Sequence, residues 1–448
     1  MKNVWSNIKL PEKFIEYSNQ GFYIIVNNEN TSSIKLDTQE YEVFQRTIQK
    51  IKSEGKKVQE DLPKEKEALD FDAEEELLRR LIRANVVTIV QPDGKEANKS
   101  VLLTHADAYL GLTDSCNFRC IYCYAECGPE RIAEIDKTTL SYEEYGTIID
   151  EVVELGYQRL YLTGGEPLLN PYVFRLARYA KGQGLFCGIL TNGSLINEKN
   201  IHKFHVFDVV KISIDSSDET INDQTRGKGT YQKIVRALVL LKEHGIKIAI
   251  NTVMTQANKE VLPDVIRFVG EEIGAIEHTI ANHVPCGRGI EDKCGIEFNE
   301  IDYYTNVVIQ SKIEVYRDRP ELVNTTKKAK ASKKTHCGMA SGDVFINCKG
   351  DVYPCRMTYH DEYRLGNVYE IGLKKALSNF DERREKITVD HLEGCKNCDL
   401  RYLCGGGCRM LHCGYSGSIE KTSTAVCAIL QKSLEYVTLL DYGLYSEK

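Results

Sequence analysis

The chain has 448 residues, a formal net charge of -7 and sixteen cysteines. This length suggests two or three domains with room for a buried core, and the net charge argues against a nucleic-acid-binding surface. No apolar run of about eighteen residues could span a bilayer and no secretory signal opens the chain, so we expect a cytoplasmic protein without a membrane partner. In that reducing compartment, clustered cysteines are expected to be metal ligands rather than disulfides.

The first part of the chain has the pattern of a small separate domain. Gly21 to Val26 and Ser32 to Leu36 alternate around a polar turn, as the strands of a β-hairpin do. Helical patterns follow over Gln39 to Ile51 and Glu74 to Ala84, and Val86 to Val90 is a candidate strand.

This order resembles the winged-helix RiPP recognition element, which is related to the chaperone PqqD; RiPPs are ribosomally made, modified peptides. The resemblance implies that residues 1–92 bind the leader sequence of a precursor peptide. Strand addition to a sheet edge, with a groove beside the helix, is the expected mode of binding. The alternative is an accessory winged helix used for dimerisation or nucleic-acid binding.

The middle third alternates short apolar runs with amphipathic helical stretches, such as Tyr142 to Leu155 and Tyr231 to His244. This βα order predicts a parallel sheet with helical crossovers, either open or closed. The candidate strands are Ala108 to Leu112, Gln158 to Leu162, Leu185 to Leu190, Val206 to Ile214, Lys247 to Met254 and Ile276 to Val284.

The loop after the first of these strands contains Cys116, Cys120 and Cys123. Three thiolates at this spacing can hold three corners of a [4Fe-4S] cube and leave the fourth iron for a small molecule with an amine and a carboxylate. The alternative is a zinc knuckle, but structural zinc requires four ligands and this loop supplies three.

The loop, with Tyr122 before its last cysteine, resembles the signature of radical S-adenosylmethionine (SAM) enzymes. About forty residues later, Gly164 to Pro167 resembles the element with which that family grips the methionine amine. The resemblance implies an α/β fold with a partial (β/α)6 barrel over residues 105–310, and catalytic roles for the three cysteines. It assigns contacts with SAM to Tyr122, Gly164, Gly165, Glu166, Pro167, Thr191, Asn192, Ser213, Asp215 and Arg226, the last because a guanidinium suits a carboxylate.

The C-terminal third carries a second group of cysteines. From local spacing alone, Cys395 to Cys408 could form a zinc ribbon. The full order, with Gly350 before Cys355, resembles the seven-cysteine SPASM domain, which we place at residues 330–435 and which usually holds two auxiliary [4Fe-4S] clusters. The resemblance assigns Cys395, Cys398, Cys404 and Cys427 to a distal cluster and Cys337, Cys355 and Cys408 to a proximal cluster.

Two departures from the family pattern bear on the reaction. Relatives with a fully ligated proximal cluster often have another cysteine shortly before the one that matches Cys337, and this chain has none there. We therefore expect an open iron, unless Cys348 or Cys413 closes it. Sulfatase-maturing members carry an acidic residue after the cysteine that matches Cys355, whereas this chain has Arg356, which disfavours a formylglycine-type oxidation.

The resemblance implies a radical SAM and SPASM maturase that acts on a precursor peptide with a leader and takes electrons from an external donor of the flavodoxin or ferredoxin type. An open iron could bind a substrate thiolate, which favours sulfur-to-carbon thioether crosslinks of the sactipeptide or ranthipeptide type. Carbon-carbon crosslinking or epimerisation of a similar peptide is the alternative. A non-enzymatic iron-sulfur electron carrier would leave Gly164 to Pro167 unexplained.

Overall fold

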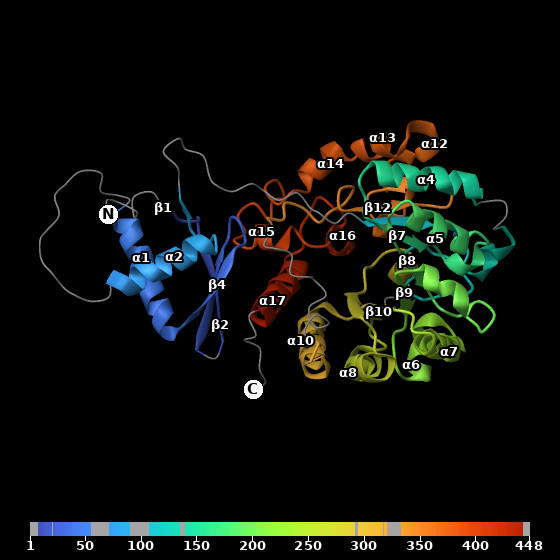
Figure 1. The fold of residues 1–448 in the computed structure, drawn as a ribbon, viewed down its shortest axis with the longest axis horizontal. Helices are drawn as coiled ribbons and strands as arrows, with labels where there is room; N and C mark the ends of the chain where they lie inside the picture. Colours follow the sequence, from blue (N-terminus) through green and yellow to red (C-terminus); the bar gives the residue numbers. More distant parts are fainter. Residues whose placement is uncertain are drawn as a thin grey trace, which may run out of the picture.

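The computed structural model describes residues 8–19, 21–54, 71–89, 107–134, 139–291, 294–316, 318–319 and 333–441. The predicted domain boundaries at residues 92, 105 and 330 lie outside these ranges. Figure 1 shows the N-terminal module at one end of an elongated molecule and the parallel strands with their helices at the other, with α17 between them.

A nine-stranded sheet forms the body of the protein, in the order β11-β10-β9-β8-β7-β6-β12-β13-β14. Strands β6 to β11 are parallel, and β6 and β11 do not pair with each other, so the barrel is partial. This confirms the predicted α/β fold and each of the six predicted strands to within three residues at every end. The six strands are β6 (Asp107–Gly111), β7 (Arg159–Thr163), β8 (Phe186–Thr191), β9 (Val209–Ser213), β10 (Ile248–Met254) and β11 (Glu277–Asn282).

Helices cover one face of these strands, and the apolar residues between the two layers form the largest core. Helix α4 begins at a capping box in which Ser141 and Glu144 satisfy each other's backbone N–H groups, and its buried face includes Ile148 and Val152. The helices that follow β6 are α4 (Tyr142–Glu154), α5 (Val173–Gly182), α6 (Glu219–Arg226), α7 (Thr230–Glu243), α8 (Leu262–Arg267), α9 (Arg288–Glu291) and α10 (Phe298–Val315).

The C-terminal cysteine-rich part continues the sheet of the barrel. Strand β12 (Asp343–Ile346) pairs in parallel with β6, which places Phe345 opposite Tyr109, and β13 (Asp351–Tyr353) and β14 (Gly366–Asn367) extend the sheet as antiparallel strands. Because β13 ends two residues before Cys355, this pairing brings that thiol to the barrel. The helices of this part are α12 (Val368–Ile371), α13 (Leu373–Ser378), α14 (Asp381–Lys386), α15 (Arg401–Cys404), α16 (Arg409–Ser416) and α17 (Thr424–Asp441).

The N-terminal module has its own sheet and core. Leu36, Phe44 and Leu81 are among the buried residues that join the three-stranded sheet β2-β3-β4 to two helices. The predicted hairpin and both helices are confirmed, and β2 is an additional strand that the sequence pattern did not reveal. The elements are β1 (Ile8–Lys9), β2 (Phe14–Asn19), β3 (Phe22–Asn27), β4 (Ser33–Asp37), α1 (Thr38–Glu54), α2 (Phe71–Arg83) and β5 (Thr88–Ile89), with β1 paired to β5.

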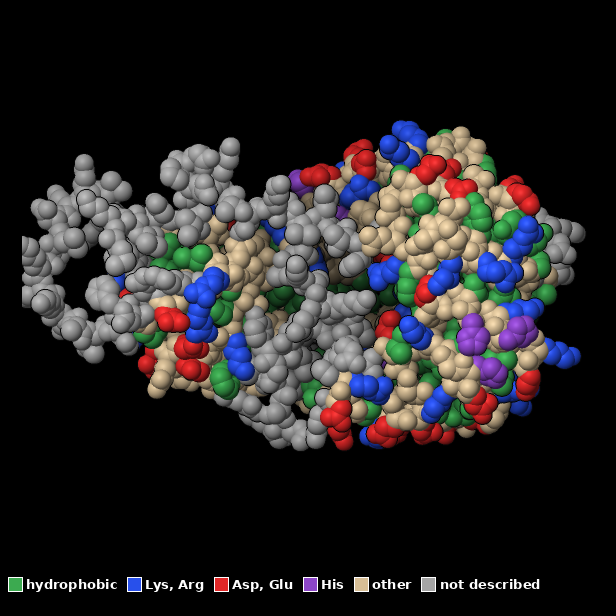
Figure 2. Space-filling view, viewed as in Figure 1, with side chains coloured by type: hydrophobic (Ala, Val, Ile, Leu, Met, Phe, Trp, Pro, Cys, Tyr) green, Lys and Arg blue, Asp and Glu red, His purple; other side chains and the backbone are tan. Residues whose placement is uncertain are grey.

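The module contacts the cysteine-rich part through β2. Lys13 forms an ion pair with Asp399, and Arg401 Nη2 lies 3.4 Å from the Glu12 carboxylate. A cavity of about 1140 Å³ lies between β2 and α17, and Cys398 and Cys427 are among its lining residues. In the space-filling view the molecule is hollowed between the module and the barrel, with hydrophobic side chains visible in the hollow (Figure 2).

Within the described part of the chain, every helix is too short or too polar to cross a membrane.

Candidate active site

Three thiols lie on the loop that leaves β6. Burial raises the pKa of Cys116 to about 12, and the charges of Glu166, Cys120 and Cys123 act in the same direction. Burial also raises the pKa of Cys120, where Cys123 adds to the effect. Because Cys120 and Cys123 each raise the pKa of another thiol of this loop, the three thiols lie close together.

Two residues that the sequence pattern left without a role support this loop. A hydrogen bond from the Cys127 thiol is the largest cause that lowers the pKa of Cys123, which favours the thiolate that binds metal. Arg288, the first residue of α9, donates from Nε to the Cys120 carbonyl at 3.0 Å and from Nη2 to the Cys127 carbonyl at 2.6 Å. The backbone N–H of Arg288 also donates to the Cys123 carbonyl at 3.1 Å.

Gly164 and Gly165 lie against the start of the same loop. Gly164 has a φ of +132°, and an added Cβ would lie 2.4 Å from the Thr113 carbonyl oxygen. A Cβ on Gly165 would lie 2.2 Å from the Ser115 carbonyl oxygen. The two glycines therefore permit close packing of this turn on the cysteine loop.

Glu166 is fully buried, and nearby residues donate hydrogen bonds to its carboxylate. It accepts from Thr191 Oγ1 at 2.6 Å, from the Asn192 N–H at 2.8 Å and from the Leu168 N–H at 3.1 Å. Burial raises its pKa to about 7, although these hydrogen bonds oppose the shift. Asn192 in turn donates to Asn117 at 2.9 Å, so Glu166 connects the end of β8 to the cysteine loop.

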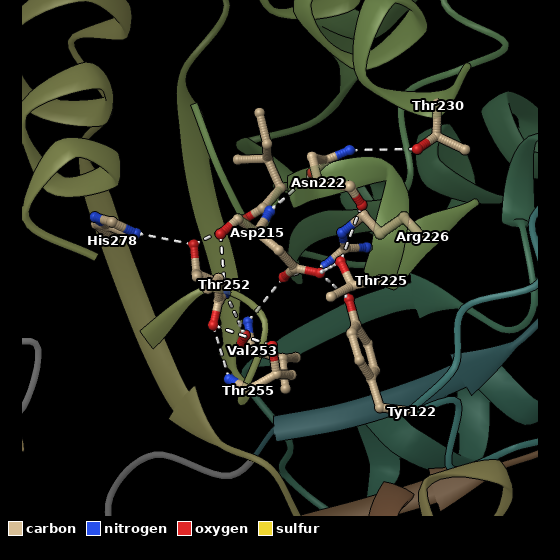
Figure 3. A network of polar contacts seen from close by, with 12 residues as sticks. Tyr122, Asp215, Asn222, Thr225, Arg226, Thr230, Thr252, Val253, Thr255 and His278 are labelled. Atoms are coloured by element: carbon tan, nitrogen blue, oxygen red, sulfur yellow. Dashed lines mark hydrogen bonds and ion pairs between the residues drawn. The ribbon is translucent and has the colours of Figure 1, made fainter. Parts of the chain in front are cut away.

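Asp215 is the centre of a buried polar network at the end of β9 (Figure 3). Its Oδ1 atom accepts from Arg226 Nη2 at 2.9 Å and from the Val253 N–H at 3.0 Å. Its Oδ2 atom accepts from Thr225 at 2.8 Å and from the Tyr122 hydroxyl. These four bonds use the acceptor positions of the carboxylate, so Asp215 orients Tyr122 and Arg226.

Replacing Asp215 with Asn should destabilise the barrel by about 3–5 kcal/mol, because Arg226 would remain buried without a counter-charge. The two side chains are only 0% and 5% exposed. Denaturant unfolding of the SAM-free protein measures the effect. The matched control is Glu198→Gln, which removes an exposed partner of Arg236 and should change stability by less than about 1 kcal/mol. Equal effects of the two substitutions would contradict the assignment.

The arrangement fits the group that the cysteine spacing predicts. Arg226 Nε is buried and has no hydrogen-bond partner among the described residues, so it can donate to an anionic ligand. Ser213 lies on the concave face of β9, opposite Asn251 of β10, and is partly exposed. Pro167 begins a short helical turn after Glu166. Nine of the ten residues expected to contact SAM thus lie at the C-terminal ends of neighbouring parallel strands or just after them, and the tenth, Arg226, ends helix α6.

The four thiols expected to hold the distal cluster also lie together. Burial raises the pKa of Cys395 to about 11, and Cys427, Cys404 and Cys398 act in the same direction while Arg409 opposes them. The Arg409 side chain is fully buried and donates to backbone carbonyl groups, including that of Gly406 at 2.8 Å. Across the described residues, no three His, Cys, Asp or Glu side chains converge as the ligands of one metal ion would.

At the proximal site, burial raises the pKa values of the Cys337 and Cys355 thiols, and the charge of Cys408 raises both further. Cys348 instead lies beside Asp114. Burial is the largest cause that raises the pKa of Cys348, and the charge of Asp114 raises it further. Cys413 lies 3.8 Å from the Tyr363 hydroxyl.

Sequence reasoning assigned no cluster to Cys286, which lies on the loop after β11. Burial is the largest cause that raises its pKa to about 12, and the charges of Cys408, Cys123 and Cys413 act in the same direction. Its neighbour Pro285 packs against Gly414 of α16, where an added Cβ would lie 2.7 Å away. Cys286 is therefore the buried thiol between the first cysteine group and the proximal group.

Comparisons with known proteins identify two domains in this chain. Residues 110–269 match the family described as the radical SAM superfamily, and residues 337–399 match the SPASM iron-sulfur cluster-binding domain. The chain thus contains a radical SAM domain and a SPASM domain, and it is an enzyme. These domains imply a [4Fe-4S] cluster that binds SAM, and auxiliary clusters.

The proteins that match this chain include a heme synthase and a bacteriocin biosynthesis protein. An AdoMet-dependent heme synthase of Methanosarcina barkeri is 27% identical over 323 residues, which cover 66% of this chain and 89% of that protein. The subtilosin biosynthesis protein AlbA of Bacillus subtilis is 24% identical, covering 72% of this chain and 71% of AlbA. The structure of Streptococcus suis SuiB bound to its precursor peptide SuiA has a TM-score of 0.57 and 15% identity, and covers 93% of this chain and 99% of SuiB.

Proposed function

We propose that this radical SAM and SPASM enzyme forms sulfur-to-carbon thioether crosslinks in a ribosomally made precursor peptide. The observation that carries the proposal is the position of the proximal thiols relative to the first cysteine loop. Burial raises the pKa of Tyr124, Arg356 opposes the shift, and Cys123 and Cys355 both add to it. A substrate near Tyr124 would thus lie between the two cysteine groups.

The thiols have defined roles in this proposal. Cys116, Cys120 and Cys123 hold the cluster that binds SAM, and the residues around Glu166 and Asp215 position the cofactor. Cys337, Cys355 and Cys408 hold the proximal auxiliary cluster; Cys395, Cys398, Cys404 and Cys427 hold the distal one. When bound, the first cluster supplies the electron that cleaves SAM to methionine and a 5'-deoxyadenosyl radical, which takes a hydrogen atom from the peptide.

Three protein ligands at the proximal site leave room for a substrate thiolate, a natural ligand for iron. The peptide then loses two hydrogens per crosslink. One hydrogen atom goes to 5'-deoxyadenosine and one proton leaves the substrate thiol. The electron released as the sulfur-carbon bond forms balances the electron consumed in cleaving SAM, so no external oxidant is required.

The extent of the structural similarity favours a peptide over a porphyrin substrate. The fold of SuiB, which was solved with its precursor peptide SuiA, matches 93% of this chain. We infer that the reaction takes place in the cytoplasm, where thiols stay reduced, with a flavodoxin or ferredoxin as the external electron donor.

The test is an anaerobic reaction of the reconstituted enzyme with SAM, reductant and the short peptides encoded beside its gene. The proposal expects one peptide to lose two hydrogen atoms in mass per crosslink as 5'-deoxyadenosine forms. A cysteine-free substrate that gains a link between two carbons would support the alternative and contradict the thioether.

Cys286 provides a check on the open proximal site. If a substrate thiolate takes the fourth position, Cys286→Ala should retain the iron content of the wild-type enzyme and its crosslinking. Iron analysis and Mössbauer spectroscopy of the resting enzyme measure this. Loss of one cluster's iron in Cys286→Ala, with no loss in Cys187→Ala, would show that a protein thiol closes the site.

We also propose that the N-terminal module binds the leader. Its β2 strand faces α17, whereas β4 lies at the opposite edge of the sheet and has no further strand partner among the described residues. An extended leader could therefore add to β4, beside α1.

Deleting residues 1–90 should weaken precursor binding by at least about tenfold, because the strand-addition surface is lost. Titration of the precursor into wild-type and truncated enzyme measures the affinity, and SAM cleavage without peptide shows that the rest of the chain remains folded. Unchanged affinity in a truncated enzyme that still cleaves SAM would remove the leader-binding role.

A further inference from the structure

The Arg356 guanidinium is an unpaired cation beside the proximal thiols. Its centre lies 4.9 Å from the centroid of the Tyr109 ring. Of the other side chains that the structure describes, none forms a hydrogen bond or an ion pair with it. None of its nitrogen atoms is among the fully buried atoms without a partner, so its five donors remain accessible to a ligand.

Arg356 lies on the concave face of the barrel. Tyr109 stacks on Tyr161 of β7 at 5.3 Å between ring centroids, and both belong to the apolar group that includes Cys337 and Cys355. The neighbouring residues of β6, such as Leu110, belong instead to the core beneath the helices. The guanidinium thus faces the space that a substrate of the barrel would enter.

The nearby carboxyl group of Asp343 leaves the Arg356 guanidinium free to bind a ligand. Burial raises the pKa of the nearby Asp343 to about 6, and Arg356 opposes this shift, yet the two side chains form no ion pair. Two other cations on this face have carboxylate partners. Arg159 pairs with Asp107, and Lys211 lies 2.8 Å from Glu277.

We propose that Arg356 binds a carboxylate of the peptide substrate and thereby selects substrates with an acidic group near the reacting cysteine. This inference rests on the proposed function, since it takes the substrate to be a peptide. A guanidinium can bind a carboxylate through two parallel hydrogen bonds, which fixes the direction of the peptide as well as its affinity. Tyr109 would support the guanidinium through its ring face.

The experiment measures the dissociation constants of two capped peptides with the reconstituted enzyme and SAM, without reductant. Their sequences are acetyl-Ala-Cys-Ala-Ala-Asp-Ala-amide and the same peptide with Asn in place of Asp. The Asp peptide is expected to bind about tenfold more tightly or better, the usual effect of a hydrogen bond to a charged group. A third peptide, the Asn form with a free C-terminal carboxylate, distinguishes a side-chain carboxylate from a chain end.

Arg356→Gln should remove the preference, and Arg356→Lys should retain part of it because the positive charge remains. The matched control is Arg364→Gln, which removes an arginine from the same segment that is paired with Asp351 at 2.7 Å. A preference that survives in Arg356→Gln, or equal binding of all three peptides to the wild type, would overturn the proposal. Binding precedes chemistry, so the two proposals can fail separately. If the enzyme prefers the Asp peptide but forms no crosslink, the thioether reaction is contradicted and the carboxylate site at Arg356 is still supported.

Discussion

Replacing Cys116, Cys120 and Cys123 together with Ala is expected to abolish the reductive release of 5'-deoxyadenosine. These thiols hold the cluster that binds SAM in the proposed site, and no other group of three described thiols lies at the ends of the parallel strands. The auxiliary iron should remain, because the SPASM cysteines lie on separate segments. Chromatographic measurement of 5'-deoxyadenosine under dithionite, with iron analysis of the same sample, measures both effects.

The control for this triple variant is Cys187→Ala. Cys187 is fully buried in β8. Burial raises its pKa, and the charges that also shift this pKa are those of Asp208 and Lys181 rather than of other thiols. Its removal should leave both iron content and SAM cleavage unchanged. Release of 5'-deoxyadenosine by the triple variant at the wild-type rate would refute the assignment of the three thiols.

Changing the reacting cysteine of the precursor to serine should abolish the crosslink and still allow some 5'-deoxyadenosine to form. A hydroxyl is a poor ligand for iron compared with a thiolate, whereas the hydrogen atom is taken from a carbon that the substitution does not touch. Mass spectrometry of the peptide and chromatography of the nucleoside report the two steps separately. A crosslink of unchanged yield in the serine peptide would be incompatible with a thioether.

Much of the fold could be predicted because local patterns determine it. The alternation of apolar runs and helical stretches predicted strands β6 to β11, and spacing alone singled out Cys116 to Cys123 as a cluster loop. Short strands such as β12 carry too little periodicity to be predicted, and their pairing partner is a matter of tertiary structure. The parallel pairing of β12 with β6 therefore appears only in the structure.

The candidate site, like the fold, could be predicted only in part from the sequence. The resemblance identified Glu166, Asp215, Thr191 and Arg226 as contacts of SAM. It did not pair Thr191 with Glu166, 25 residues away, or Arg226 with Asp215, 11 residues away. The sequence pattern gave Cys286 no ligand role, and its position beside Cys408 depends on how the loop after β11 packs on α16. Arg356 was visible as a departure from the acidic residue of sulfatase-maturing enzymes, but its lack of an ion-pair partner required the fold.

The most direct test of the account is the fate of the cysteine sulfur in the modified precursor. The product should have lost two hydrogen atoms, resist alkylation by iodoacetamide after treatment with a reductant, and show by two-dimensional NMR a bond between the cysteine sulfur and a carbon of another residue. A product that still reacts with iodoacetamide and carries a carbon-carbon link, or one of unchanged mass with an inverted stereocentre, would contradict thioether formation.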